Sequence, residues 1–261
     1  MKVATIGHAV HDENGKAYEG KPGDQTGTEV YIAKWYCYSS SPWYAVFRAK
    51  TKKARKKIAA AMEAACNNPN IGYNQHNRTS LYKLASANGW KLDKVGLCET
   101  DCSALVAVCC NAAGITVTKD MYTAIEKKTL EATGAFKVYT SDAYCKSQAK
   151  LKRGDILLKN GHTAVVLKVE DIYKEVTASK YPAVKDEKLA GNYRVTADAL
   201  NMRNGAGSSN SIMTVVYKDQ ILTCDGSYSI SGGTKWMYVS FILNDEIKYT
   251  GFCSSKYLVK E

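Results

Sequence analysis

Apolar residues in the first 170 positions alternate between a helical period and short runs typical of strands. Four stretches carry apolar residues every three or four positions, the spacing of one helix face: 51–66, 78–88, 102–113 and 121–130. Six others are rich in β-branched and aromatic residues and predict strands: Val3–Ile6, Glu29–Trp35, Tyr44–Phe47, Phe136–Tyr139, Ile156–Leu158 and Thr163–Leu167. The mixture predicts an α+β domain over residues 1–170.

The pattern changes after residue 170. Residues 171–191 are polar and mixed in charge, which favours a linker. Short strands then follow at the spacing of a small barrel: Asn192–Ala197, Gly205–Ser211, Ile212–Tyr217, Gln220–Asp225, Trp236–Phe241 and Ile247–Phe252. We therefore expect an α+β domain at 1–170, a linker at 171–191 and a small all-β barrel at 192–261.

A cysteine stands at the start of the third predicted helix. Thr100 and Asp101 are both suitable N-cap residues, and Gly114 is a natural stop. A cysteine at a helix N-terminus faces unpaired backbone N–H groups and the positive end of the helix dipole, and both favour the nucleophilic thiolate. Cys102 is therefore a candidate nucleophile. The alternative is a small buried apolar residue, the usual fate of a free cysteine.

A histidine stands at the start of a predicted hairpin strand. The strands at 156–158 and 163–167 flank Asn160-Gly161, a strong hairpin-turn signal. His162 begins the second strand, where its ring can lean out at the end of the sheet. Of the four histidines, at 8, 11, 76 and 162, this one has the best setting for a general base. The alternative is a turn histidine exposed to solvent.

Three short motifs give the chain a family resemblance. They read Asp-Cys-Ser-Ala at 101–104, Arg-Gly-Asp-Ile-Leu at 153–157 and Gly-His-Thr-Ala-Val-Val at 161–166. Together they resemble the NlpC-type cysteine peptidases, whose motifs read Asp-Cys-Ser-Gly, Gly-Asp-Leu and Gly-His-Val. The resemblance covers about residues 55–170, and Ala104 departs from the family glycine. It implies a papain-like fold and cleavage of an amide bond in peptidoglycan stem peptides.

The resemblance also implies roles for individual residues. Cys102 would attack the scissile carbonyl, with His162 as base and then acid, and Tyr73 would help to hold the oxyanion. Asp101 would grip the free amine of a stem peptide, with Ser103 near the same pocket, or Asp101 would only cap the helix. A third group should orient His162, and the sequence leaves it undecided among five residues: Glu175, Asp171, Asp24, Gln25 and His8.

Both ends of the chain carry further resemblances. Gly-His-Ala at 7–9 and Gly-Asp-Gln-Thr-Gly at 23–27 are similar to the opening of small phage lysins. Residues 199–205 and 250–258 resemble the first and last motifs of bacterial SH3 domains, which commonly bind cell wall. That resemblance implies a wall-binding role, which we assign to four residues: Asn201, Arg203, Trp236 and Tyr238.

Charge and cysteine content narrow the partners and the compartment. The formal net charge is +11, and basic residues are densest at Arg48–Lys57. Such a patch attracts polyanions, so an anionic cell wall and nucleic acid are both candidates, and the alternative is a solvated helix face. We expect no specific nucleic-acid binding. The nine cysteines show no paired metal-binding spacing, which favours a reduced cytoplasmic origin without cofactor or metal.

The chain start has no signal-peptide pattern, and no apolar run is long enough to cross a membrane. We therefore expect a monomer made in the cytoplasm that acts on the wall after release. Three functions compete. The first is an endolysin-like cysteine peptidase targeted by its SH3 domain. The second is an N-acetylmuramoyl-L-alanine amidase or an acyltransferase on the same scaffold. The third is a non-catalytic wall-binding protein.

Overall fold

The computed structural model describes residues 2–171, 173–244 and 246–261, and divides them into two compact units. The first unit spans Lys2–Asp171, and the second contains the described residues from 173 to 261. Met1 and Ile172, which fall in the predicted catalytic domain and linker, lie outside the described residues. No helix of the described chain is both long and apolar enough to cross a membrane.

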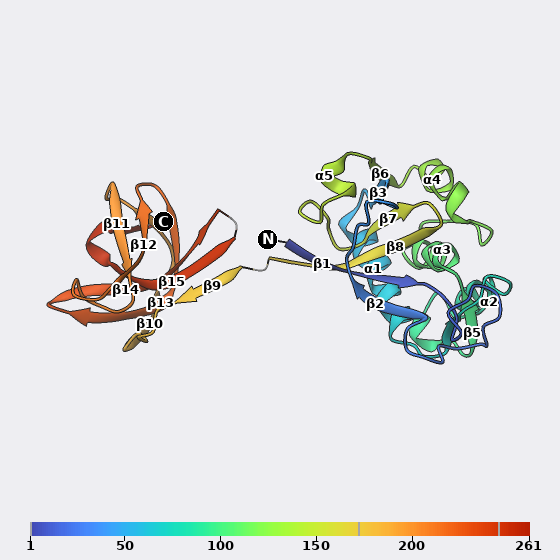
Figure 1. Cartoon of the computed structure of the whole chain (residues 1–261), viewed down its shortest axis with the longest axis horizontal. Helices are drawn as coiled ribbons and strands as arrows, with labels where there is room; N and C mark the ends of the chain where they lie inside the picture. Colours follow the sequence, from blue (N-terminus) through green and yellow to red (C-terminus); the bar gives the residue numbers. More distant parts are fainter. Residues whose placement is uncertain (1, 172, 245) are drawn as a thin grey trace. The chain divides into compact units, whose positions relative to one another are not determined.

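The first unit is built on an antiparallel sheet of six strands, whose order in the sheet differs from their order along the chain (Figure 1). Their order is β2-β1-β8-β7-β3-β6, and their bounds are β1 Lys2–Ala9, β2 Val30–Lys34, β3 Ala45–Ala49, β6 Phe136–Tyr139, β7 Asp155–Lys159 and β8 His162–Asp171. The two-residue turn at Asn160-Gly161 joins β7 to β8, with Lys159 opposite His162. Strand β1 pairs with the other edge of β8, and Lys2 lies opposite Asp171, so the first and last residues of the segment 2–171 are neighbours.

Helices cover one face of this sheet. They are α1 Lys52–Cys66, α2 Ser80–Ala87, α3 Cys102–Ala112 and α4 Thr123–Ala132. The short α5 Asp142–Cys145 lies on the opposite face, where Cys145 belongs to the same apolar cluster as Val46 and Trp43. A small parallel pair, β4 Ile71–Tyr73 and β5 Cys98–Thr100, and a 3-10 turn at Leu92–Lys94 complete the unit. Helix α1 begins as its sequence predicts, because the Thr51 hydroxyl accepts a hydrogen bond from the Ala54 N–H at 3.1 Å.

Alternation along β8 divides the core into two. Val165 and Leu167 pack against the helices, whereas Ala164 and Val166 face a second apolar cluster with Trp43 and Leu151. Because β8 is buried on both faces, its residues form the near-continuous apolar run seen in the sequence. The sheet is therefore rigid at the point where β8 begins, and that point carries His162.

The second unit is an eight-stranded sheet. Its strands are β9 Lys174–Thr177, β10 Val184–Val195, β11 Ala199–Arg203, β12 Ile212–Tyr217, β13 Ile221–Ser231, β14 Thr234–Leu243, β15 Ile247–Ser254 and β16 Leu258–Lys260, with a 3-10 turn at Ser255–Tyr257. The order is β12-β11-β15-β14-β13-β10-β16, and β9 pairs with β15. In the described part of the chain β12 and β16 do not pair, so the expected barrel is not closed.

Two local expectations for this region need correction. Residues 171–191, expected as a linker, carry β9 and much of β10, because their polar composition suits strands with a solvent-facing side. Residues 205–211 form a turn rather than a strand, in which Gly207 adopts a φ of 115°. The strand before that turn is β11.

Candidate active site

The predicted nucleophile is the first residue of α3. The parallel pairing of β4 with β5 places Tyr73 opposite Thr100, two residues before Cys102. The Asp101 side chain accepts a hydrogen bond from the Ala104 N–H at 2.7 Å and caps the helix. In the described part of the chain no hydrogen bond uses the N–H of Cys102 itself. A donor is thus available beside the sulfur.

Asp101 and Ser103 belong to one buried polar network. The guanidinium of Arg78 donates to both carboxylate oxygens of Asp101, and its Nη2 donates to the Ser103 hydroxyl at 2.9 Å and to the Met121 carbonyl at 2.5 Å. Ser103 in turn donates to Asp101 at 3.0 Å. The charge of Asp101 is therefore neutralised within the protein, and both residues hold the start of α3. Arg78 was not foreseen, because an arginine before a helix has no distinctive sequence signal.

Burial opposes the thiolate expected at Cys102. Its residue is 7% exposed, and burial raises the pKa of the thiol to about 12, with the nearby charge of Asp101 acting in the same direction. Backbone hydrogen bonding from Thr163 and Ser103 acts in the opposite direction and is weaker. Desolvation thus exceeds the helix-terminus effect. The Thr163 contact places the sulfur next to the first residues of β8.

His162 pairs with His8 across two neighbouring strands. The Nε2 atom of His162 lies 3.0 Å from Nδ1 of His8, and the ring centroids are 5.2 Å apart. The β1–β8 ladder ends at Gly7 opposite Val165, so both rings lie just beyond the paired region. The contact uses one ring nitrogen of His162 and leaves Nδ1 for another partner.

The other four candidates for the group that orients His162 make their contacts away from that residue. Asp24 and Gln25 stabilise their own loop: Asp24 accepts from the N–H of Gly27 at 2.6 Å, and Gln25 donates to Gly23 at 3.0 Å. Asp171 is at the far end of β8, 3.6 Å from Lys2. Glu175 belongs to β9 of the second unit, 3.5 Å from Lys248. Among the five, His8 is the residue in contact with His162.

Both histidines are held in the neutral form. Burial is the main cause that lowers the pKa of His162 to about 3 and that of His8 to about 4; the charge of Lys159 contributes to both shifts, and that of His8 to the shift of His162. Aromatic rings enclose the pair, with the Trp43 ring 6.1 Å from His162 and the Tyr31 ring 4.8 Å from His8. The free protein at pH 7 therefore holds a thiol and two imidazoles without net charge.

Tyr73 has the properties of a neutral hydrogen-bond donor. It is 4% exposed, and burial raises the pKa of its phenol to about 12. The phenol oxygen accepts a hydrogen bond from Gln75 Nε2 at 2.9 Å, which leaves its own hydrogen free to donate. The charges of Cys102 and Asp101 act on this phenol, consistent with its place beside the start of α3.

A buried acid that sequence reasoning missed supports the start of β8. Glu126 on α4 is fully buried, and its Oε1 lies 2.7 Å from the Thr163 hydroxyl, which also donates to the Leu157 carbonyl at 2.9 Å. One hydroxyl hydrogen cannot serve both acceptors, so a protonated Glu126 completes the arrangement. Burial raises the pKa of Glu126 to about 8. The available signal was its spacing of four from Leu130, which placed it on the buried helix face.

The second unit has a surface pocket of about 280 Å³ that includes three of the four predicted wall-binding residues. Asn201, Arg203 and Trp236 line it together with Tyr257. The indole nitrogen of Trp236 is buried and has no hydrogen-bond partner in the described structure. The fourth residue, Tyr238, instead lines a separate pocket of about 160 Å³.

A scan against protein families matches residues 6–175 to the endolysin-like domain. No curated protein and no solved structure matches the chain. The matched region contains Cys102, His162 and His8. No cluster of three or more His, Cys, Asp or Glu side chains suited to a metal ion occurs among the described residues.

Proposed function

The chain belongs to the endolysin-like domain family, which indicates a phage-type lytic function at the cell wall, and on this premise we propose that it is a cysteine peptidase acting on peptidoglycan. In this proposal the first unit has a papain-like, NlpC-type active site. Cys102 is the nucleophile, His162 the general base, and His8 the group that orients His162. The scissile bond is an amide of a stem peptide.

One observation carries the proposal. The backbone of Thr163, the residue after His162, lowers the pKa of the Cys102 thiol, and the Nε2 atom of His162 lies 3.0 Å from Nδ1 of His8. A nucleophile, a base beside it and a group orienting that base form the minimal constellation for nucleophilic catalysis.

Attack begins from neutral groups. As the Cys102 sulfur bonds to the scissile carbonyl carbon, its proton passes to Nδ1 of His162. This requires the resting hydrogen of His162 to be on Nε2, where it can donate to Nδ1 of His8. The carbonyl oxygen becomes an oxyanion, which the N–H of Cys102 and the hydroxyl of Tyr73 would stabilise. Because burial disfavours a free thiolate, proton transfer accompanies attack.

Collapse of the tetrahedral intermediate breaks the C–N bond. The leaving amine takes the proton from His162 and departs, leaving an acyl group on Cys102 as a thioester. Water then attacks this thioester while His162 accepts one of its protons, and that proton returns to the sulfur as the carboxylic acid product leaves. Asp101 acts in this scheme as a helix cap paired with Arg78, with Ser103 as its support.

The second unit would target the enzyme to the wall as a bacterial SH3 domain does. The supporting feature is the pocket lined by Asn201, Arg203 and Trp236, which combines an aromatic side chain with a cation. Tyr238 lines a different pocket, so we do not assign it to this binding site. Replacing Trp236 with Ala should weaken sedimentation with purified walls and leave cleavage of a soluble stem peptide intact.

A turbidity assay on purified walls tests the catalytic proposal. Cys102→Ala should abolish clearing, whereas Cys109→Ala, a change in another buried cysteine of α3, should preserve it. Equal clearing by wild type and Cys102→Ala would refute the cysteine mechanism. Mass spectrometry of the fragments then separates a peptidase, which leaves cut stem peptides, from an amidase, which releases stems from the sugar.

A further inference from the structure

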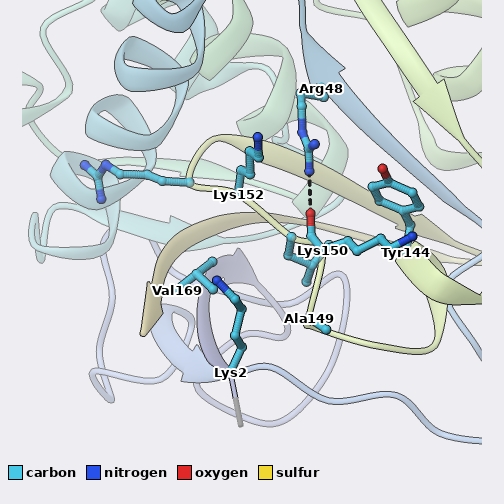
Figure 2. A pocket seen from close by; sticks show the side chains of 9 residues that line it. Lys2, Arg48, Tyr144, Ala149, Lys150, Lys152 and Val169 are labelled. Carbon is cyan, nitrogen blue, oxygen red and sulfur yellow. Dashed lines mark hydrogen bonds between the residues drawn. The ribbon is translucent and has the colours of Figure 1, made fainter. Parts of the chain in front are cut away.

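A cationic cavity lies at the end of the six-stranded sheet remote from the histidine pair. Its volume is about 420 Å³, and it opens where β1 begins and β8 nears its end (Figure 2). Five of the residues that line it are basic: Lys2, Arg48, Lys150, Lys152 and Arg153. None of the lining residues within the described chain is acidic. Such a cavity has a positive potential that favours an anion.

The two arginines are occupied within the protein. Arg48 donates to both carboxylate oxygens of Asp155, at 2.7 and 2.6 Å, and to the Lys150 carbonyl at 2.8 Å (Figure 2). Arg153 is paired with Glu63. The two arginine side chains therefore form the wall of the cavity, and a ligand would bind to the lysines instead.

The lysines supply the free charge. Among the described residues no carboxylate lies within 4.0 Å of the ammonium of Lys150 or Lys152. Lys2 is 3.6 Å from Asp171, an exposed pair that contributes little and can exchange for a ligand. Lys2 at the start of β1 and the two lysines of the segment before β7 thus line the cavity from different sides and supply its positive charge (Figure 2).

The segment that carries Lys150 and Lys152 is fixed in place. Asp155, which is fully buried, accepts a hydrogen bond from the Lys152 N–H at 2.8 Å as well as from Arg48. Gly154 follows with a φ of 84°, and a Cβ there would lie 2.1 Å from the Arg55 carbonyl oxygen. The backbone is thus held before any ligand arrives, which lowers the entropy cost of binding.

The aromatic content of the cavity disfavours nucleic acid. Proteins that bind single strands use free aromatic rings on which bases stack. The ring of Tyr144, which lines the cavity, is already stacked on Tyr139 with centroids 4.1 Å apart, and Lys150 lies 5.5 Å from its centre. The cavity offers charge without a stacking surface, which suits a phosphate flanked by polyol.

We propose that this cavity binds the phosphate groups of an anionic polyol-phosphate polymer of the cell wall, separately from the catalytic site. The choice of a wall polymer rests on the proposed function. The binding itself does not, because it uses none of the residues assigned to catalysis. Bound polymer would hold the first unit against the wall independently of the second unit.

The test measures binding of soluble glycerol-phosphate polymer to the full chain by titration calorimetry at 0.15 M salt. Lys150→Gln/Lys152→Gln should weaken binding about tenfold, because two of the three lysine charges that line the cavity are lost. Lys56→Gln/Lys57→Gln, which removes the same charge from the exposed side of α1, should change it less than about twofold. Equal weakening in both variants would show a net-charge effect and overturn the site.

A competition experiment distinguishes the ligand. Single-stranded DNA of equal charge should displace the polymer poorly, and displacement at equal concentration would overturn the choice of a polyol phosphate. Cleavage of a soluble stem peptide by the Lys150/Lys152 variant is measured in parallel. Normal cleavage with weakened polymer binding supports the cavity proposal. If no variant and no wild type cleaves the peptide, the proposed catalysis fails while the binding result still stands.

Discussion

The two ends of the six-stranded sheet use ionisable residues in opposite ways. At one end Cys102 and His8 are buried and His162 is partly buried, and burial shifts the pKa of each toward its neutral form. At the other end Lys150 and Lys152 are exposed and line the cationic cavity. The same sheet thus supports proton transfer where desolvation is strong and electrostatic attraction where water remains. Burial, more than residue type, decides which chemistry each end can perform.

The largest effect should come from removing the base at the buried end. His162→Ala should lower kcat for a soluble stem peptide by about 10³-fold or more, because no other group can accept the thiol proton. His8→Gln should lower it by about 10- to 100-fold, since the amide can still accept a hydrogen bond from His162.

The matched control for His8→Gln is His11→Gln, whose ring contacts only a neighbouring backbone carbonyl in the described structure, at 2.8 Å. That variant should keep full activity. If His8→Gln also kept full activity, the histidine pair would be a packing feature, and the buried end would lose its orienting group.

These residues also mark what the sequence could and could not predict. The helix start at Cys102 and the strand start at His162 follow from caps, a turn signal and local periodicity, so both were found. His8 could not be chosen from five candidates, because its contact depends on β1 pairing with β8 across more than 150 positions of chain. Local patterns do not determine which distant strands become neighbours.

The thiolate expected at Cys102 is opposed by burial, for a related reason. A helix N-terminus is a local feature and favours the thiolate, whereas desolvation depends on everything that covers the sulfur. Similarly, Arg48 was counted in a basic patch because it stands next to other basic residues in the sequence, but it lies on β3 and is buried against Asp155. Tertiary contacts decided both cases.

The second largest effect tests the buried ion pair beneath the cationic end. Asp155→Asn should destabilise the first unit by about 3–5 kcal/mol, because it leaves the buried Arg48 without its partner charge. Urea unfolding measures the loss. Asp142→Asn, which breaks an exposed pair with Lys146, should cost no more than about 0.5 kcal/mol. Similar losses in the two variants would mean that burial does not set the strength of the pair.

The buried acid near Cys102 should give the buried end a distinctive pH dependence. The pKa of Glu126 is raised to about 8 in the folded protein. The contribution of its neutral carboxyl group to the free energy of unfolding is therefore fully present below about pH 4.5, and it is lost as the pH rises through about 8. The variant Glu126→Gln lacks a carboxyl group that can ionise, so its stability does not show this loss. The stability of this variant relative to wild type should therefore rise by about 3 kcal/mol between pH 4.5 and 7. Glu131→Gln, on the exposed face of α4, should give a flat difference.

The smallest effect, and the one that separates the two ends most cleanly, is the response to salt. Raising salt from 0.05 to 0.3 M, about a sixfold change, should weaken wall binding through Lys150 and Lys152 severalfold, because exposed charges are screened. Cleavage of a soluble, uncharged stem-peptide analogue should change little, since Cys102 and His162 react inside a site from which salt is excluded. The Lys150→Gln/Lys152→Gln variant should bind more weakly at low salt and respond less to added salt than wild type does. If peptide cleavage fell in parallel with wall binding, the cationic cavity would be part of the catalytic site, and the division between the two ends of the sheet would be incorrect.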